Sequence, residues 1–205
     1  MTKLWRGPFP VVLASKSAAR RSLLAASGIP FEIFEAKIDE RGMETPLLAA
    51  GATAGEIALH LARAKALFVS AKMRERLVIG ADQTLCLENR LLTKAADKAA
   101  LVATLEALSG RDHELHSACC IARANTVLFE TVLIARLTCR RLSRAFIEAY
   151  VAEAGEALLA SVGGYQMEGL GIQLFEVIEG DHATILGLPL LPLLKFLREE
   201  GSLLS

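Results

Sequence analysis

Two hydroxyls and two arginines lie close together near the start of the chain, in Leu13-Ala14-Ser15-Lys16-Ser17-Ala18-Ala19-Arg20-Arg21. Hydroxyls, guanidinium groups and the unpaired N–H groups of a helix start are the donors that bind phosphate. The spacing therefore predicts an anion-binding turn that contains Ser15, Ser17 and Arg20. The simpler alternative is that Ser17 only caps a helix whose arginines lie in solvent.

Two carboxylates have the chemistry to act on a bound phosphate. Asp82 follows an apolar run, and Gly80 and Ala81 before it are expected to leave space for a ligand. Glu40 follows Asp39 after a short predicted strand, where a carboxylate can hold a divalent metal or position a water. Asp82 is the leading candidate for a general base or a metal ligand, and the sequence does not separate these roles. Alternatively, Asp82 only turns the chain after a core strand.

Two lysines, a histidine and a third carboxylate complete the set of candidates. Lys65 lies within a predicted helix, off its apolar stripe, and can reach a phosphate from there. Lys94 follows a predicted hairpin and is expected to point to the same end of the sheet. His113 either contacts a ligand or is a satisfied histidine at a turn. Glu168 lies among four glycines in residues 163–171, which indicates that the backbone closely approaches another group.

The segments that must position these residues alternate between the apolar pattern of strands and the apolar pattern of helices. Strands are predicted at 11–13, 31–34 and 77–84, hairpins at 85–92 and 113–139, helices at 18–27, 54–72, 95–108, 143–153 and 189–199, and a small-residue linker at 46–55. This order predicts an α/β fold, a mixed β-sheet with flanking helices. A chain of this length can bury the core of one domain, residues 1–205.

Composition excludes several classes of function. The formal net charge of zero gives no long-range field toward nucleic acid or an anionic membrane. No segment approaches the roughly 18 apolar residues of a membrane span, and no GxGxxG or Walker A motif is present. The cysteines lack metal-site spacing, which predicts small buried side chains in a reducing, cytoplasmic compartment; they are Cys86, Cys119, Cys120 and Cys139.

The chain resembles the Maf family of nucleoside triphosphate pyrophosphatases. The matching blocks occur in the family's order and span nearly the whole chain, so together they are highly specific although each alone is weak. The blocks are Leu13-Ala14-Ser15-x-Ser17 with Arg20, Asp39-Glu40, Leu61-Ala62-Arg63-x-Lys65, Gly80-Ala81-Asp82-Gln83, Leu108-Ser109-Gly110-x-x-His113, Glu168-Gly169-x-Gly171 and Gly187-Leu188-Pro189-Leu190.

The resemblance implies a metal-dependent, cytoplasmic enzyme that cuts a nucleoside triphosphate between its α- and β-phosphates. It implies Mg²⁺ or Mn²⁺ as the cofactor and two lobes around a nucleotide cleft. It also implies a homodimer whose partner is the small-molecule nucleoside triphosphate, with no nucleic acid and no membrane as a partner. Asp82 matches the family's proton acceptor, and Glu40 and Asp82 are the expected metal ligands. The expected phosphate-binding residues are Ser15, Ser17, Arg20, Lys65 and Lys94.

The positions that set substrate choice in the family correspond to Ala19, Gln83 and Glu168. Gln83 and Glu168 are most similar to the 7-methyl-GTP subgroup. A carboxylate at 168 can accept hydrogen bonds from the N1–H and N2–H₂ edge of guanine, whereas uracil and thymine present carbonyls that repel it. Ala19 stands where that subgroup carries an aromatic residue, which weakens the expected preference for a methylated base. Alanines also replace two usual prolines, at 18 and 95.

The competing hypothesis is a nucleotide-binding regulator of division or septum formation that does not turn over its ligand. The presence of Glu40 and Asp82 beside the cationic residues argues against it, because binding a phosphate is easier without carboxylates.

Overall fold

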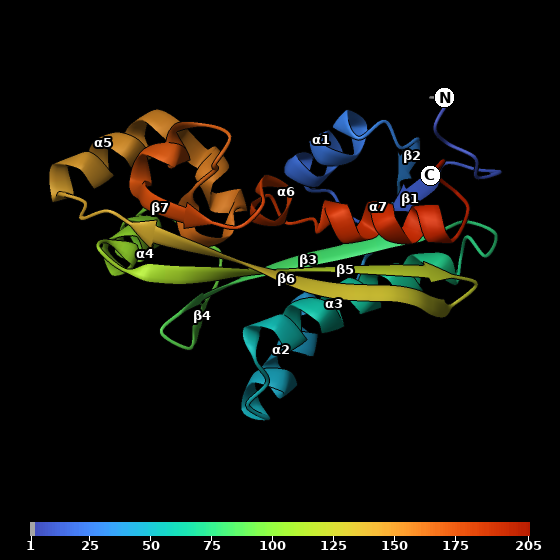
Figure 1. Cartoon of the computed structure of the whole chain (residues 1–205). Coiled ribbons are helices and arrows are strands. Elements are labelled where there is room, and N and C mark those ends of the chain that lie inside the picture. Colours follow the sequence, from blue (N-terminus) through green and yellow to red (C-terminus); the bar gives the residue numbers. More distant parts are fainter. Residues whose placement is uncertain (1–2) are drawn as a thin grey trace. The chain divides into compact units, whose positions relative to one another are not determined.

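The computed structural model describes residues 3–205 and confirms the α/β class, with a mixed sheet and flanking helices (Figure 1). The strands are β1 (Val11–Leu13), β2 (Phe31–Ile33), β3 (Val78–Leu87), β4 (Arg90–Leu92), β5 (Asp112–Arg123), β6 (Thr126–Cys139) and β7 (Phe175–Glu179). The α-helices are α1 (Ala18–Ala26), α2 (Glu40–Ala49), α3 (Ala54–Ser70), α4 (Lys98–Leu108), α5 (Arg144–Ala154), α6 (His182–Ile185) and α7 (Leu190–Glu199). Short 3-10 helices occur at Gly155–Ala160, Val162–Gly164 and Leu170–Leu174.

The strands follow the order β2-β1-β3-β5-β6-β7, and β4 pairs with β3. β1 runs parallel to β2 and β3, whereas β4 is antiparallel to β3 and β7 to β6, which makes the sheet mixed. Ala124 and Asn125 join β5 to β6 with φ of 51° and 63°. Positive φ at both residues is the conformation of a tight hairpin turn, as predicted for this segment.

The described chain forms two compact units, each built from separated segments. Unit 1 contains the chain up to Gln83, Ser117–Leu133 and His182–Ser205. Unit 2 contains Thr84–His116 and Ile134–Asp181. Because β3, β5 and β6 each contribute to both units, a single domain over residues 1–205 stays a prediction. No helix among the residues described is long and apolar enough to cross a membrane.

Side-chain caps fix where the longer helices begin. In α1 to α5 the residue before the helix accepts a hydrogen bond from a backbone N–H of the first turn, which satisfies a donor that the helix leaves unpaired. In α3 this becomes a capping box, because the Glu56 side chain also accepts from the backbone of Thr53. The five capping residues are Ser17, Asp39, Thr53, Asp97 and Ser143.

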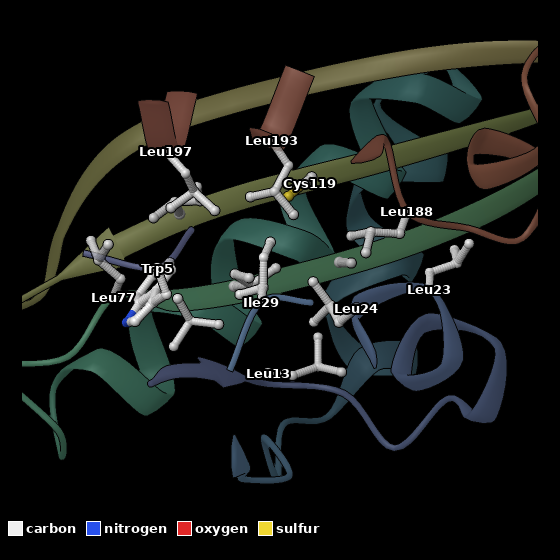
Figure 2. Close-up of a cluster of buried hydrophobic side chains, with 14 residues drawn as sticks. Trp5, Leu13, Leu23, Leu24, Ile29, Leu77, Cys119, Leu188, Leu193 and Leu197 are labelled. Carbon is white, nitrogen blue, oxygen red and sulfur yellow. The ribbon is translucent and has the colours of Figure 1, made fainter. Parts of the chain in front are cut away.

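One face of the unit 1 strands packs against α1 and α7. Figure 2 shows the side chains of this cluster gathered between the strands and these helices. They include Leu13 and Cys119 from strands and Leu24, Leu193 and Leu197 from helices, all buried. The opposite face of these strands packs against α3. Alternate residues of a strand point to opposite sides, so each strand can contribute to both faces. Its buried residues are Val12, Ala14, Val69 and Val78, together with Ala58, Ala62, Ala66, Ala118, Cys120 and Ala122.

Unit 2 has its own apolar core. Helix α4 packs against α5, and both bury an apolar stripe. The stripes consist of Leu101, Leu105 and Leu108 on α4 and Ile147, Tyr150 and Val151 on α5. Tyr165 and Leu174 are buried from the segment that precedes β7. The predicted helices at 95–108 and 143–153 are therefore confirmed, with slightly different ends.

Small residues allow α3 to lie directly against β3. A Cβ added to Gly80 would collide with the carbonyl oxygen of Ala62 and lie 2.6 Å from the nitrogen of Ala66. The space beside Gly80, expected to admit a ligand, is thus filled by the α3 backbone. The buried face of α3 is also wider than predicted, and it includes Lys65. The expectation that Lys65 lies off that face is wrong, because the neighbouring alanines extend it.

Three other segments differ from the sequence prediction. Residues 46–55, expected to form a linker, include the second half of α2, with Pro46 inside the helix. The strand predicted to end at residue 84 continues to Leu87, so Asp82 lies within β3 and not at its tip. Strand β7 was not predicted; it pairs with β6 through a register shift between Thr138 and Cys139.

The cysteines follow the prediction in most respects. All four are free, three are buried and Cys86 is partly buried. Burial raises the pKa of the Cys119 thiol to about 12, an effect that the positive charge of Arg20 partly opposes. A thiol with so high a pKa is inert near neutral pH.

The packing of α3 on β3 yields a stability prediction. Gly80→Ala should lower the free energy of unfolding by about 2–3 kcal/mol or more, because the added methyl must push apart two backbones. Urea unfolding followed by circular dichroism measures the change. Gly51→Ala is the control: its φ is +77° but nothing lies within 4 Å, so only the backbone strain of about 1 kcal/mol is expected. Equal losses in the two variants would contradict the close contact.

Candidate active site

A buried ion pair joins α3 to β3 in unit 1. Lys65 Nζ lies 2.5 Å from Asp82 Oδ1 and 2.9 Å from Glu40 Oε1. Lys65 and Asp82 are buried, whereas Glu40 is half-exposed at the start of α2. We refer to Glu40, Lys65 and Asp82 as the Lys65 centre. The structure thus brings together three of the predicted site residues, and one ammonium contacts both carboxylates.

Helix α2 separates the roles of the Asp39-Glu40 pair. Asp39 Oδ1 accepts a hydrogen bond from the N–H of Gly42 at 3.0 Å and so caps α2. Glu40 lies in the first helical turn and not in a loop after a strand, contrary to the prediction. The cap therefore fixes the turn from which Glu40 reaches Lys65.

Glu44 is a fourth ionisable group at this place, and the sequence analysis missed it. It lies one turn after Glu40 on α2 and is partly buried. Burial raises the pKa of Glu44, and the negative charges of Asp82 and Glu40 raise it further, whereas Lys65 opposes the shift. The four-residue spacing from Glu40 is a helical signal, but the sequence analysis predicts no helix over residues 40–49 and therefore does not single out Glu44.

Arg20 is buried beside Asp82 and anchored to the main chain. Its Nε donates to the carbonyl of Gly187 at 2.7 Å, and its Nη1 donates to the carbonyl of Ala81 at 2.8 Å and to Ser15 Oγ at 3.2 Å. Burial lowers the pKa of Arg20, and the negative charge of Asp82 opposes this shift. No atom in residues 3–205 accepts a hydrogen bond from Nη2, so this edge of the guanidinium is available to a ligand oxygen.

In the serine turn the structure shows the expected cap but not the expected solvent-exposed Arg20, and anion binding there stays a prediction. Ser17 does cap α1, since its side chain accepts from the N–H of Arg20, and Arg21 is exposed. Arg20, however, does not lie in solvent. Ser15 accepts both from Arg20 Nη1 and from the N–H of Ser17. Ala19 is partly exposed in the first turn of α1.

Gln83 ties β3 to α6 within unit 1. Its amide nitrogen lies 2.8 Å from Ser117 Oγ, 3.0 Å from the carbonyl of Ile185 and 3.2 Å from that of Thr184. These acceptors fix the orientation of the amide, because the reversed amide would place oxygen against oxygen. The amide nitrogen is thus engaged with the protein, a contact that local sequence could not predict.

The remaining candidates, Lys94 and Glu168, belong to unit 2 and are both exposed. Within the described part of the chain, neither forms an ion pair with a side chain. Their roles stay predictions.

The glycines around Glu168 have packing reasons of their own. Gly163 and Gly164 have φ of +80° and +73°, and added Cβ atoms would collide with Leu85 and Leu101 respectively. A Cβ on Gly171 would collide with the backbone of Gln166. The close approach that these glycines permit is therefore to the protein itself.

His113 is buried in unit 2. Its Nε2 lies 2.8 Å from the hydroxyl of Tyr165, and its ring also packs beside Phe175. Burial lowers the pKa of His113 to about 4, although the charge of Asp112 partly opposes this. His113 thus bonds inside the protein through Nε2, but it lies in β5 and not at a turn. His113 and His116 do not contact each other, as expected for strand residues three apart. His116 Nε2 instead lies 3.0 Å from Glu114 Oε2.

The Lys65 centre has the donor chemistry for a divalent metal that arrives with a phosphate. Among residues 3–205 no group of three or more histidine, cysteine or acidic side chains is arranged to hold a metal ion. Mg²⁺ is commonly held by one or two carboxylates, with water and substrate phosphates as the other ligands. Glu40 and Asp82 fit this pattern.

Comparison with known proteins gives consistent matches. The family model described as Maf-like protein matches residues 10–200. A protein of Rhodopseudomonas palustris (strain BisB18), named nucleoside triphosphate pyrophosphatase, is 54% identical over 96% of this chain and 96% of its own length. A protein of Rhizobium johnstonii, named 7-methyl-GTP pyrophosphatase, is 51% identical over 94% of this chain and 97% of its own.

A solved structure from Mycobacterium abscessus, named nucleoside-triphosphatase / dITP/XTP pyrophosphatase, is 18% identical to this chain. It aligns with 93% of this chain and 96% of its own, with a TM-score of 0.39. A likeness this slight carries no functional argument.

The pKa of His113 predicts how stability depends on pH. Because the folded pKa of about 4 is below the ordinary 6.5, folding favours the neutral ring. This contribution is complete above pH 6.5 and is lost as the pH falls toward 4, by up to about 3 kcal/mol. Urea unfolding between pH 7.5 and 4 should therefore show a smaller acid loss in His113→Phe than in the wild type. The exposed His60→Gln is the control, and an unchanged slope in His113→Phe would contradict the assignment.

Proposed function

The chain belongs to the Maf family, and we propose that it is a nucleoside triphosphate pyrophosphatase that hydrolyses the bond between the α- and β-phosphates. The observation that carries this proposal is a juxtaposition on β3. Ala81 anchors the guanidinium of Arg20, and the next residue, Asp82, pairs with Lys65. The guanidinium of Arg20 and the Lys65–Asp82 ion pair are thus held at consecutive residues of β3, which suits a reaction on a polyanion.

The phosphate-binding side consists of Arg20 and the turn before α1. The carbonyls that hold Nε and Nη1 leave Nη2 as the edge for a phosphate oxygen. The start of α1 carries no acidic residue in its first turn, so its positive dipole end also favours an anion. Ser15 and Ser17 shape this turn. Lys65, and Lys94 by its match to the family, supply further positive charge.

The catalytic side consists of Glu40 and Asp82, which we assign as the ligands of Mg²⁺ or Mn²⁺. A divalent cation at such a site polarises a phosphoryl oxygen and lowers the pKa of a bound water. Without a ligand, Asp82 contacts Lys65 through Oδ1, and we assign Oδ2 as the atom that accepts the proton of the attacking water. The water oxygen forms the new bond to phosphorus, the anhydride bond breaks, and a nucleoside monophosphate and pyrophosphate leave.

For the substrate base we propose a guanine nucleotide, including its N7-methylated form, with Glu168 as the residue that recognises its edge. The relative named 7-methyl-GTP pyrophosphatase supports this proposal. Gln83 retains Oε1 beside Gly187 for a ligand contact. Ala19 offers no stacking face, so we expect weaker discrimination between methylated and plain guanine than an aromatic residue would give. A cytoplasmic homodimer is the form that we expect, from the family resemblance.

Removing the proposed base tests the reaction. Asp82→Asn should lower kcat for pyrophosphate release by at least about a hundredfold, because the amide neither accepts the proton nor carries the charge. Pyrophosphate release with Mg²⁺ or Mn²⁺ across a nucleotide panel measures it, and thermal unfolding checks that the variant folds. Asp39→Asn, which keeps the α2 cap, should retain activity. Full activity of Asp82→Asn would overturn the assignment of Asp82 as the base. A wild type that binds nucleotide without releasing pyrophosphate would favour the competing hypothesis of a nucleotide-binding regulator.

Recognition of the base has its own test. Glu168→Gln should lower kcat/KM for GTP and 7-methyl-GTP about tenfold more than for UTP and dTTP, because guanine offers the carboxylate two adjacent donors, whereas uracil and thymine flank a single N3–H with carbonyl oxygens. Glu153→Gln, which removes another exposed carboxylate of unit 2, is the matched control. An equal loss for both classes of substrate would remove Glu168 from base recognition.

A further inference from the structure

Lys65 has two tasks that conflict in the structure. As a phosphate-binding residue it must present its ammonium to the nucleotide, yet the ammonium contacts Asp82 at 2.5 Å and Glu40 at 2.9 Å. These are also the two carboxylates assigned to the metal, so the inference that follows rests on the proposed function. A divalent cation and the Lys65 ammonium require the same negative charge.

The carboxylates of Glu40 and Asp82 are already paired without a ligand. Lys65 contacts both of them and Arg20 lies beside Asp82, so two positive charges face these two negative ones, and Glu44, one turn after Glu40, is a third carboxyl at this place. A bare divalent cation would therefore meet two carboxylates that a buried ammonium already occupies, and that ammonium would repel it. A triphosphate changes this balance, because its oxygens can accept the ammonium and also bind the cation.

The backbone of Lys65 is fixed, whereas its side chain has rotatable bonds. Helix α3 is fixed against β3 by the contact of Gly80 with Ala62 and Ala66. The ammonium, in contrast, sits on a flexible four-carbon stem and can change partners by rotamer changes alone. The fold thus holds the backbone of Lys65 in place, and a change of partner requires only rotation of its stem.

We propose that Lys65 is an exchangeable counter-ion: its ammonium neutralises Glu40 and Asp82 in the free enzyme and passes to the triphosphate when nucleotide binds. The consequence is that a divalent cation binds tightly only together with nucleotide. Lys65 would thereby suppress binding of metal alone and couple completion of the metal site to the presence of substrate.

The test is binding of Mn²⁺ alone, measured by titration calorimetry and by the electron paramagnetic resonance signal of free Mn²⁺. Lys65→Met removes the ammonium and nearly preserves the stem, so Mn²⁺ without nucleotide should bind at least about tenfold more tightly than to the wild type. Arg63→Met is the matched control. It removes one positive charge from the same helix, but Arg63 pairs with a different carboxylate, Glu130. Mn²⁺ affinity should therefore not change.

Lys65→Gln provides a second variant, because it removes the charge while a donor remains. Thermal unfolding shows whether each variant is folded. A folded Lys65→Met or Lys65→Gln that binds Mn²⁺ no more tightly than the wild type would overturn the proposal, and so would an equal gain in Arg63→Met.

The wild type offers a measurement that does not depend on variants. Its affinity for Mn²⁺ should rise at least about tenfold when a non-hydrolysable α,β-methylene analogue of GTP is present. If the analogue binds but the Mn²⁺ affinity is unchanged, the counter-ion proposal fails and the proposed function stands. If the analogue does not bind with or without Mn²⁺, the proposed function itself fails.

Discussion

The contact between Lys65 and Asp82 is the interaction on which the rest of the site depends. An ammonium and a carboxylate that are both buried lose the solvation of water, and their attraction only roughly offsets that loss. Such a pair adds little net stability compared with apolar side chains of similar size. Its place beside Arg20 therefore favours a role in chemistry over one in holding the fold together.

The local packing is arranged to make this contact possible. Gly80 has no side chain, and Ala62 and Ala66 present only methyl groups, so α3 lies close enough to β3 for Lys65 to meet Asp82. Around the pair, backbone carbonyls hold Arg20, and a capped helix presents Glu40. Arg20 is thus held by main-chain atoms, and Glu40, Lys65 and Asp82 by one another, which limits the reorganisation needed when a polyanion binds.

Local patterns were sufficient to predict much of the fold. The apolar runs, and a cap such as Ser17, predicted where strands and helices occur, since these signals depend on near neighbours. Helix α2 was not predicted, because Pro46 and the alanines and glycines after it resemble a linker. The stabilisation of that helix comes from its Asp39 cap and its packing on α3, and the second of these is not visible in the local sequence.

The candidate site was predictable as a set of residue types but not as a set of contacts. The positions of Glu40, Lys65 and Asp82 matched a family pattern, yet which charge lies against which depends on the packing of α2, α3 and β3. Gln83 bonds to α6 about a hundred residues later in the chain, and no local pattern specifies such a partner. The same holds for His113, whose Tyr165 partner explains a histidine that local sequence left undecided.

The most direct test of the account is a crystal structure of the protein with Mn²⁺ and a non-hydrolysable nucleoside triphosphate analogue. We predict that the triphosphate accepts a hydrogen bond from Arg20 Nη2 and from Lys65, and that Glu40 and Asp82 bind the cation in place of the ammonium. A complex in which the triphosphate lies elsewhere and the 2.5 Å contact between Lys65 and Asp82 is unchanged would contradict the account.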